Sequence, residues 1–189
     1  MTGRNENIDR WDPDHAPRAD DLARACAAVR DLIINIRPEQ WAAPTPCSEW
    51  DVRQLVAHLT GMNRVFVALL NDEPIPRPQA AFDRPGALER AYVGPLGTAT
   101  GAERLQIRLY DLLAHGWDLA QATGQPAALP EDLAEQALVF ARTHLADQGR
   151  PGRFAPAQLA ADHAPAIERL ATFLGRAVPA HRSSGTAPG

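Results

Sequence analysis

Apolar residues recur at spacings of three and four residues in five separate segments of this chain. In the first segment, which starts at Asp20, they are Leu22, Ala25, Cys26, Val29, Leu32, Ile33 and Ile36. This period places apolar side chains on one face of an α-helix. Similar runs cover about 48–71, 102–123, 129–149 and 164–176, and proline or glycine lies near the ends of each. No alternating pattern is long enough to build a sheet, so the sequence predicts an all-α fold.

Capping signals locate several of the predicted helix ends. Ser48 and Asp51, three residues apart, resemble a capping box and predict that the second helix starts at Ser48. Pro38 should end the first helix and Gly124 the third. The stretch "AYVGPLGTATG" predicts a short extended piece with turns.

Length and composition favour one globular domain. The chain has 189 residues, of which 45% are hydrophobic, and its formal net charge is −4. We expect the domain to cover 18–178, after a flexible segment at 1–17 and before a disordered tail at 179–189.

The same composition bears on partners and location. A net negative charge gives no electrostatic reason to expect binding to nucleic acid or to an anionic membrane. No apolar run approaches the roughly 18 residues that a membrane span needs. The first 20 residues are polar and acidic without an apolar core, so we expect no signal peptide. The two cysteines, Cys26 and Cys47, do not make a disulfide framework. These features predict a cytoplasmic protein.

The third predicted helix contains "RLYDLLAHGWDLA", in which four polar residues lie on one side. These residues are Arg108, Asp111, His115 and Asp118. In one interpretation this stripe faces solvent, and Arg108 and Asp111 form a surface ion pair. In the other, Tyr110 and Trp117 face protein on the opposite side, and the stripe faces the interior or a cleft. Periodicity alone leaves both interpretations open.

Under the second interpretation, Asp111 and His115 are one helical turn apart and can reach the same metal ion. A third ligand must come from elsewhere, and His58 is the best candidate because it borders the apolar face of the second helix. Two histidines and one carboxylate suit zinc, and also iron, nickel or manganese.

Two strings also carry a resemblance to a known family. "PTPCSEWDVRQLVAHLTGMN" and "IRLYDLLAHGWDLAQATGQP" are similar to the actinobacterial metal-binding family related to mycothiol-dependent maleylpyruvate isomerase, within the DinB/YfiT-like superfamily. The likeness extends over about 20–178. It implies a DinB-like, up-down four-helix bundle that holds a divalent metal through His58, Asp111 and His115. Asp111 stands where the isomerase has a glutamate.

One interval departs from the pattern that the resemblance implies. Such proteins have a whole helix between the helix with the first histidine and the later pair, but here the interval is the proline-rich "NDEPIPRPQAAFDRPGALERAYVGPLG". We therefore expect a shortened bundle with an extra C-terminal helical segment. A C-terminal helix could fill the gap, a second subunit could fill it as a homodimer, or the metal site could be open.

Four further residues are assigned candidate roles around the predicted metal. Arg108 could bind a substrate carboxylate, or pair with Asp111. Asp118 could orient an imidazole, or be a surface acid. Asn63 and Trp117 are candidates for binding a cofactor, and packing is the alternative for Trp117.

Three functions remain open from the sequence. The first is a metal-dependent transferase or isomerase that uses mycothiol as thiol cofactor on a small electrophile. The second is a metal-dependent hydrolase or a specialised biosynthetic enzyme. The third is a non-catalytic protein that binds metal or a ligand as a dimer.

Overall fold

The computed structural model describes residues 16–70, 82–94, 97–145, 154–161 and 163–178 of the chain. The α-helices among them are α1 (Ala19–Ile34), α2 (Val52–Leu70), α4 (Gly101–Thr123), α5 (Glu131–His144) and α6 (Ala166–Phe173). A 3₁₀ helix, η2, covers Pro38–Gln40, and two short strands, β1 (Ala91–Gly94) and β2 (Gly97–Thr100), precede α4. The prediction of a mainly helical fold is confirmed.

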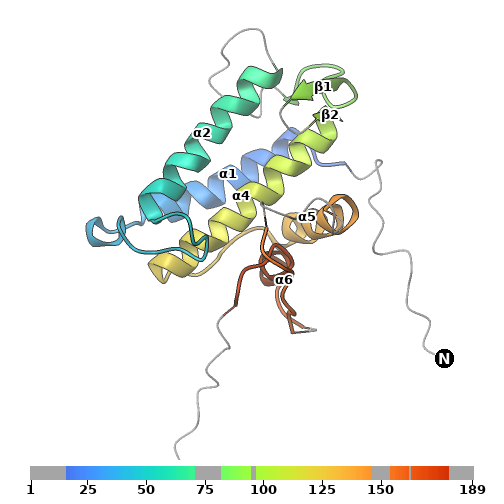
Figure 1. The fold of residues 1–189 in the computed structure, drawn as a ribbon. Helices are drawn as coiled ribbons and strands as arrows, with labels where there is room; N and C mark the ends of the chain where they lie inside the picture. Colours follow the sequence, from blue (N-terminus) through green and yellow to red (C-terminus); the bar gives the residue numbers. More distant parts are fainter. Residues whose placement is uncertain (1–15, 71–81, 95–96, 146–153, 162, 179–189) are drawn as a thin grey trace, which may run out of the picture.

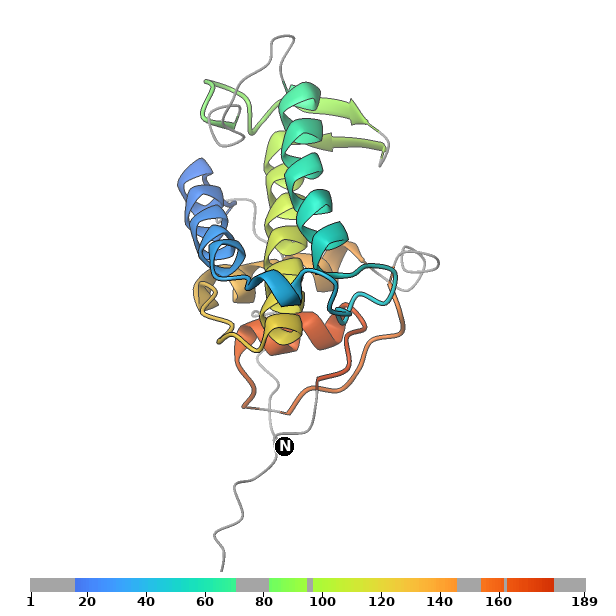
Figure 2. The same ribbon diagram turned by 90° about the vertical axis from the view of Figure 1, so that its left-hand side faces the viewer.

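Helix α4 lies at the centre of the arrangement. It packs against α1, α2, α5 and α6. The helices α1, α2 and α4 run side by side, whereas α5 and α6 run across α4 (Figures 1 and 2). Gly116 permits the close approach of α1, because a Cβ atom there would lie 2.9 Å from the Val29 side chain. Few side chains of a helix surrounded in this way are exposed to solvent.

The start of α2 differs from the prediction. Ser48 lies in a turn, and the helix begins at Val52 with Asp51 before it. The Asp51 carboxylate accepts from the Gln54 amide N–H at 2.8 Å, and the Gln54 side chain accepts from the Asp51 N–H at 3.0 Å. The capping box is therefore Asp51 and Gln54, and the predicted cap at Ser48 is wrong. The shift leaves 46–50 as a loop, called here the 46–50 loop.

Both ends of α4 follow from local sequence. Thr100 accepts from the Glu103 N–H at 3.2 Å, and Glu103 accepts from the Thr100 N–H at 2.7 Å, which completes a capping box. Gly124 ends the helix, as predicted, with φ 66° in the left-handed region that favours glycine.

The expectation that no sheet would form needs correction. Strands β1 and β2 pair as an antiparallel two-stranded sheet, with Ala91 opposite Thr100 and Gly94 opposite Gly97. Each strand has four residues, too few for the alternating pattern used to predict strands. Arg104 of α4 donates hydrogen bonds to backbone oxygens of Tyr92 and Gly97, which fastens the sheet to the helix.

The shortened interval between α2 and β1 is described only from residue 82 onward, and 83–90 form turns and bends. The segments predicted to be flexible or disordered lie outside the described residues, apart from 16 and 17. Among the helices described, none combines the length and hydropathy that crossing a bilayer requires.

Candidate metal centre

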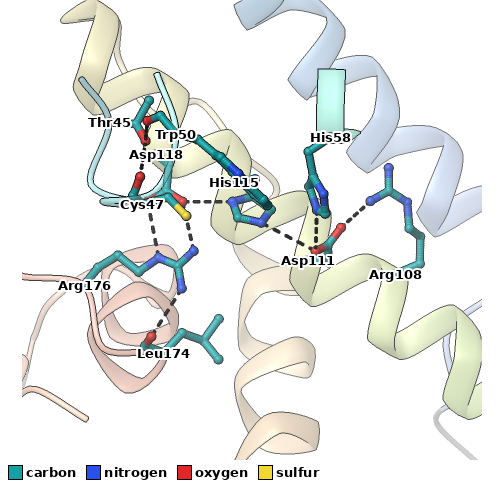
Figure 3. A network of polar contacts seen from close by, with 10 residues as sticks. All are labelled: Thr45, Cys47, Trp50, His58, Arg108, Asp111, His115, Asp118, Leu174 and Arg176. Carbon is teal, nitrogen blue, oxygen red and sulfur yellow. Dashed lines mark hydrogen bonds and ion pairs between the residues drawn. The ribbon is translucent and has the colours of Figure 1, made fainter. Parts of the chain in front are cut away.

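Three side chains from two helices converge where α2 packs against α4 (Figure 3). His58 comes from α2, and Asp111 and His115 come from α4. Asp111 Oδ1 lies 3.5 Å from His58 Nε2 and 3.6 Å from His115 Nε2. One donor atom from each residue lies within 4.8 Å of those of the other two. The structure thus brings together the three predicted ligands.

These separations can be compared with those that a metal ion imposes. Zinc bonds to imidazole nitrogen and carboxylate oxygen are about 2.0–2.2 Å long, so tetrahedral ligand atoms lie roughly 3.3–3.6 Å apart. The two distances to Asp111 Oδ1 agree with that spacing. The residues present therefore fit a divalent ion held by two nitrogens and one oxygen.

Arg108 lies on the side of Asp111 that faces away from the two imidazoles (Figure 3). Its side chain is fully buried, and its guanidinium donates to Asp111 Oδ2 and, at 3.1 Å, to the backbone oxygen of Leu59. Asp111 keeps its other oxygen, Oδ1, toward the two imidazoles. Arg108 thus fixes the direction in which the carboxylate points.

The charge state of Asp111 is set by opposing effects. Burial raises its pKa, but the His58 hydrogen bond and the charges of His115, Arg108 and His58 outweigh burial, so the pKa lies below its ordinary value. The carboxylate is ionised near neutral pH, which is the form that binds a cation.

The second nitrogen of His115 is held by a buried carboxylate. His115 Nδ1 lies 3.0 Å from Asp118 Oδ2, and Asp118 is fully buried. In the neutral ring, donation from Nδ1 to this carboxylate leaves the lone pair on Nε2, the nitrogen on the Asp111 side. Asp118 is therefore not a surface acid, and its contact with His115 is the one that the orienting role requires.

Trp50 of the 46–50 loop covers the imidazoles. Its ring centroid lies 4.4 Å from that of His58 and 5.5 Å from that of His115. Thr45 fixes the loop, because its hydroxyl lies 2.8 Å from the Trp50 carbonyl oxygen and 3.0 Å from that of Cys47.

A cavity of about 610 Å³ opens onto the three ligands. Its wall is formed by the 46–50 loop, by residues of α2 and α4, and by C-terminal segments. Its apolar members include Trp50, Met62, Ile107, Tyr110, Leu145, Phe154 and Leu174. The volume suits a small molecule with an apolar part.

Cys47 belongs to a second group of donor atoms, with His115 and Asp118. Burial raises the pKa of the Cys47 thiol, and the Asp118 carboxylate raises it further. Both oxygens of Asp118 already accept hydrogen bonds, from His115 and from Arg176. Among the described residues, His58, Asp111 and His115 are therefore the better candidate ligands.

The other residues predicted to bind substrate or cofactor are not found in the cavity wall of the described structure. Arg108 is not among the residues that line the cavity, and its position favours pairing with Asp111 over contact with substrate. Trp117 is 1% exposed in the core and does not reach the cavity. The side chain of Asn63 lies outside the described part of the chain.

Sequence reasoning did not identify two residues of this region. Trp50 carries no local signal for this position, because its contact with His58 depends on the fold of the 46–50 loop. Arg176 is 58 positions from Asp118, and no local spacing connects them.

The family model of the mycothiol maleylpyruvate isomerase N-terminal domain matches residues 22–90. This match includes His58, whereas Asp111 and His115 lie beyond its end.

Two relatives are similar over most of the chain. They are the uncharacterized proteins Rv0738 of Mycobacterium tuberculosis (strain ATCC 25618 / H37Rv) and MT0763 of Mycobacterium tuberculosis (strain CDC 1551 / Oshkosh). Each is 38% identical over 173 residues, which cover 82% of this chain and 95% of the relative. No solved structure matches significantly.

Proposed function

Because this chain belongs to the DinB-like superfamily, in the family of the mycothiol maleylpyruvate isomerase N-terminal domain, we propose that it is a metal-dependent enzyme of thiol chemistry. In this proposal His58, Asp111 and His115 hold a divalent ion. The reaction is transfer of a low-molecular-weight thiol, such as mycothiol, to a small electrophile, or an isomerisation that passes through such an addition.

One observation carries the proposal. Three donor atoms from two helices converge within 4.8 Å of one another at the wall of a cavity of about 610 Å³. Such a set leaves positions on the ion free, and three protein ligands with an open position are typical of catalytic rather than structural zinc.

The residues around the proposed metal would have different roles. His58 and His115 would supply nitrogen donors to the ion, and Asp111 would supply the negative charge. A divalent ion with an open position lowers the pKa of a thiol or water that it binds. Trp50, packed on both imidazoles, limits access of water from its side. The apolar wall would receive the carbon skeleton of the electrophile.

The donor set restricts the metal without fixing it. Two imidazoles and one carboxylate suit zinc, and the same set accepts iron, nickel or manganese. Zinc is our choice because the spacing of the donor atoms agrees with tetrahedral geometry.

Metal content tests the first half of the proposal. The protein is purified without an affinity tag, and its metal is measured by mass spectrometry beside His58→Ala, Asp111→Ala and His115→Ala. His163→Ala is the control, since His163 is exposed and distant in sequence from the ligands. We expect about one ion per chain in the wild type and the control, and loss in the three variants. Metal below about a tenth of an equivalent, unchanged by His115→Ala, would disprove the site.

Thiol dependence tests the second half. The metal-loaded protein is incubated with a panel of small electrophiles, with and without mycothiol, and both thiol loss and product are followed. Turnover that requires the thiol supports the proposal. Turnover without it would favour the hydrolase. The homodimer remains a prediction, which light scattering during size-exclusion chromatography would test.

A further inference from the structure

The end of α6 reaches the candidate metal centre through one side chain, Arg176. Its Nη2 lies 2.9 Å from Asp118 Oδ2, and its Nε lies 3.3 Å from Asp118 Oδ1. Two parallel N–H donors on the two oxygens of one carboxylate form a bidentate pair, which fixes the plane of the carboxylate as well as its position. Asp118 is fully buried, and 10% of the Arg176 side chain is exposed.

The contacts then continue to the metal ligand. The oxygen that accepts from Arg176 Nη2 also accepts from His115 Nδ1, at 3.0 Å. The orientation of the His115 ring is therefore tied to that of Asp118, and Asp118 is held by Arg176 (Figure 3).

The backbone holds Arg176 firmly in place. The N–H of Gly175 donates to the Thr172 carbonyl at 2.9 Å, and the N–H of Arg176 donates to the Ala171 carbonyl at 3.0 Å. With φ 90° at Gly175, this is a Schellman motif at the end of α6. The third guanidinium nitrogen, Nη1, donates to the Leu174 carbonyl at 3.2 Å, so the side chain is anchored to the same turn.

Arg176 differs from Arg108 in what it contacts. Arg108 pairs with Asp111, a candidate ligand. The contacts of Arg176 described above are with Asp118 and Leu174, and Arg176 also lines the cavity. The hydrogen bonds of Arg176 therefore connect it to the metal site through Asp118 and His115.

We propose that Arg176 is a positioning residue of the metal centre, which locks Asp118 and thereby the ring of His115, so that the end of α6 is part of the site. This inference rests on the proposed metal site, and it goes beyond that site by assigning a role to a segment outside the residues that the family model matches.

The test compares two arginines of the same C-terminal segment. Arg176→Met removes the bidentate pair with Asp118. Arg169→Met is the matched control, because Arg169 pairs with Glu135 of α5 and with no group of the metal centre that the structure describes. Affinity for zinc is measured in the full-length protein by competition with a chromophoric chelator. Loss of a group that orients a metal ligand lowers affinity about 10–100-fold. We expect a fall of at least about tenfold for Arg176→Met, and less than about twofold for Arg169→Met.

The opposite result has a clear meaning. An arginine that acted only through its charge would repel the cation, so its removal would tighten binding. Unchanged or tighter binding in Arg176→Met would overturn the inference. If that variant fails to fold, Arg176→Lys is used instead. Lysine keeps the charge but lacks the planar fork, so affinity should still fall, and wild-type affinity would overturn the inference.

A second readout does not require metal. Long-range ¹H–¹⁵N spectra of the metal-free protein report which ring nitrogen of His115 carries the proton, with His115→Ala used for assignment. We expect a single Nδ1–H form in the wild type and in Arg169→Met, and a mixture in Arg176→Met. If the wild type binds no metal, the proposed function fails, and this spectrum decides the inference alone. A pure Nδ1–H form in Arg176→Met would then refute it.

Discussion

The substitution Arg108→Met separates two roles for this arginine, as a partner of Asp111 and as a binding group for substrate. The guanidinium is fully buried and donates to the Asp111 carboxylate and the Leu59 carbonyl. Methionine preserves most of the aliphatic stem, so packing changes little while the charge disappears. The Asp111 carboxylate then loses the one guanidinium that the structure shows paired with it.

The size of the effect can be worked out from the burial of the pair. Removing one partner of a buried ion pair costs about 3–5 kcal/mol. Asp111 keeps 19% exposure and two imidazole neighbours, which places the expected loss near the lower end. About 3 kcal/mol corresponds to a fall of roughly 6–12 °C in the melting temperature of a domain of this size.

Thermal unfolding should be followed in EDTA and again with saturating zinc. A divalent cation at Asp111 would supply the missing positive charge, so we expect a smaller loss in zinc than in EDTA. Arg104→Met is the control, because Arg104 is also buried on α4 but donates to backbone carbonyls of Tyr92 and Gly97. Its loss should be the same in both buffers. An Arg108→Met protein that melts like the wild type but requires more substrate would refute the ion-pair interpretation.

Three further predictions concern packing and titration. Gly116→Ala should destabilise the protein by about 1–3 kcal/mol in urea unfolding, because its Cβ would lie 2.9 Å from the Val29 side chain. Recovery of stability when Val29→Ala is added would support this cause. Unchanged stability in Gly116→Ala would contradict it. In a Cys26→Ser background, alkylation of Cys47 at pH 7.5 should be slower than that of a free cysteine, because burial and a nearby carboxylate raise its pKa; an equal rate would contradict this. In EDTA, the lowered pKa of Asp111 stabilises the fold at pH values above the pKa of an ordinary carboxyl group, and this contribution is lost as the pH falls through the folded-state pKa. Asp111→Asn should therefore flatten the acid side of the plot of unfolding free energy against pH. An unchanged slope would show that Asp111 contributes nothing there.

The helices could be predicted because their signals are local. The period of apolar residues identified each described α-helix, and Gly124 marked the end of α4 correctly. The start of α2 was predicted wrongly because Ser48 and Asp51 match the pattern of a capping box as well as the true pair, Asp51 and Gln54. The choice between them depends on the 46–50 loop, whose conformation is set by contacts such as those of Thr45.

The metal centre was only partly accessible from the sequence. Helix geometry places Asp111 and His115 on one side of α4 without any knowledge of the fold. That His58 joins them depends on α2 lying against α4. The interval that looked too short for a helix also left open what covers α4, and the structure shows that Leu174, Gly175 and Arg176 contribute to the cavity wall.

The sequence by itself determined roughly where the described α-helices lie along the chain. It also determined which side of α4 carries Arg108, Asp111, His115 and Asp118, because 3.6 residues per turn relate spacing directly to direction. Only the tertiary structure decided that this stripe faces the interior and the cavity and not open solvent, since this depends on which helices pack around α4. It also brought His58 and Arg176 to the stripe from 53 and 58 positions away along the chain. Local spacing cannot specify such contacts, because they depend on how whole helices pack.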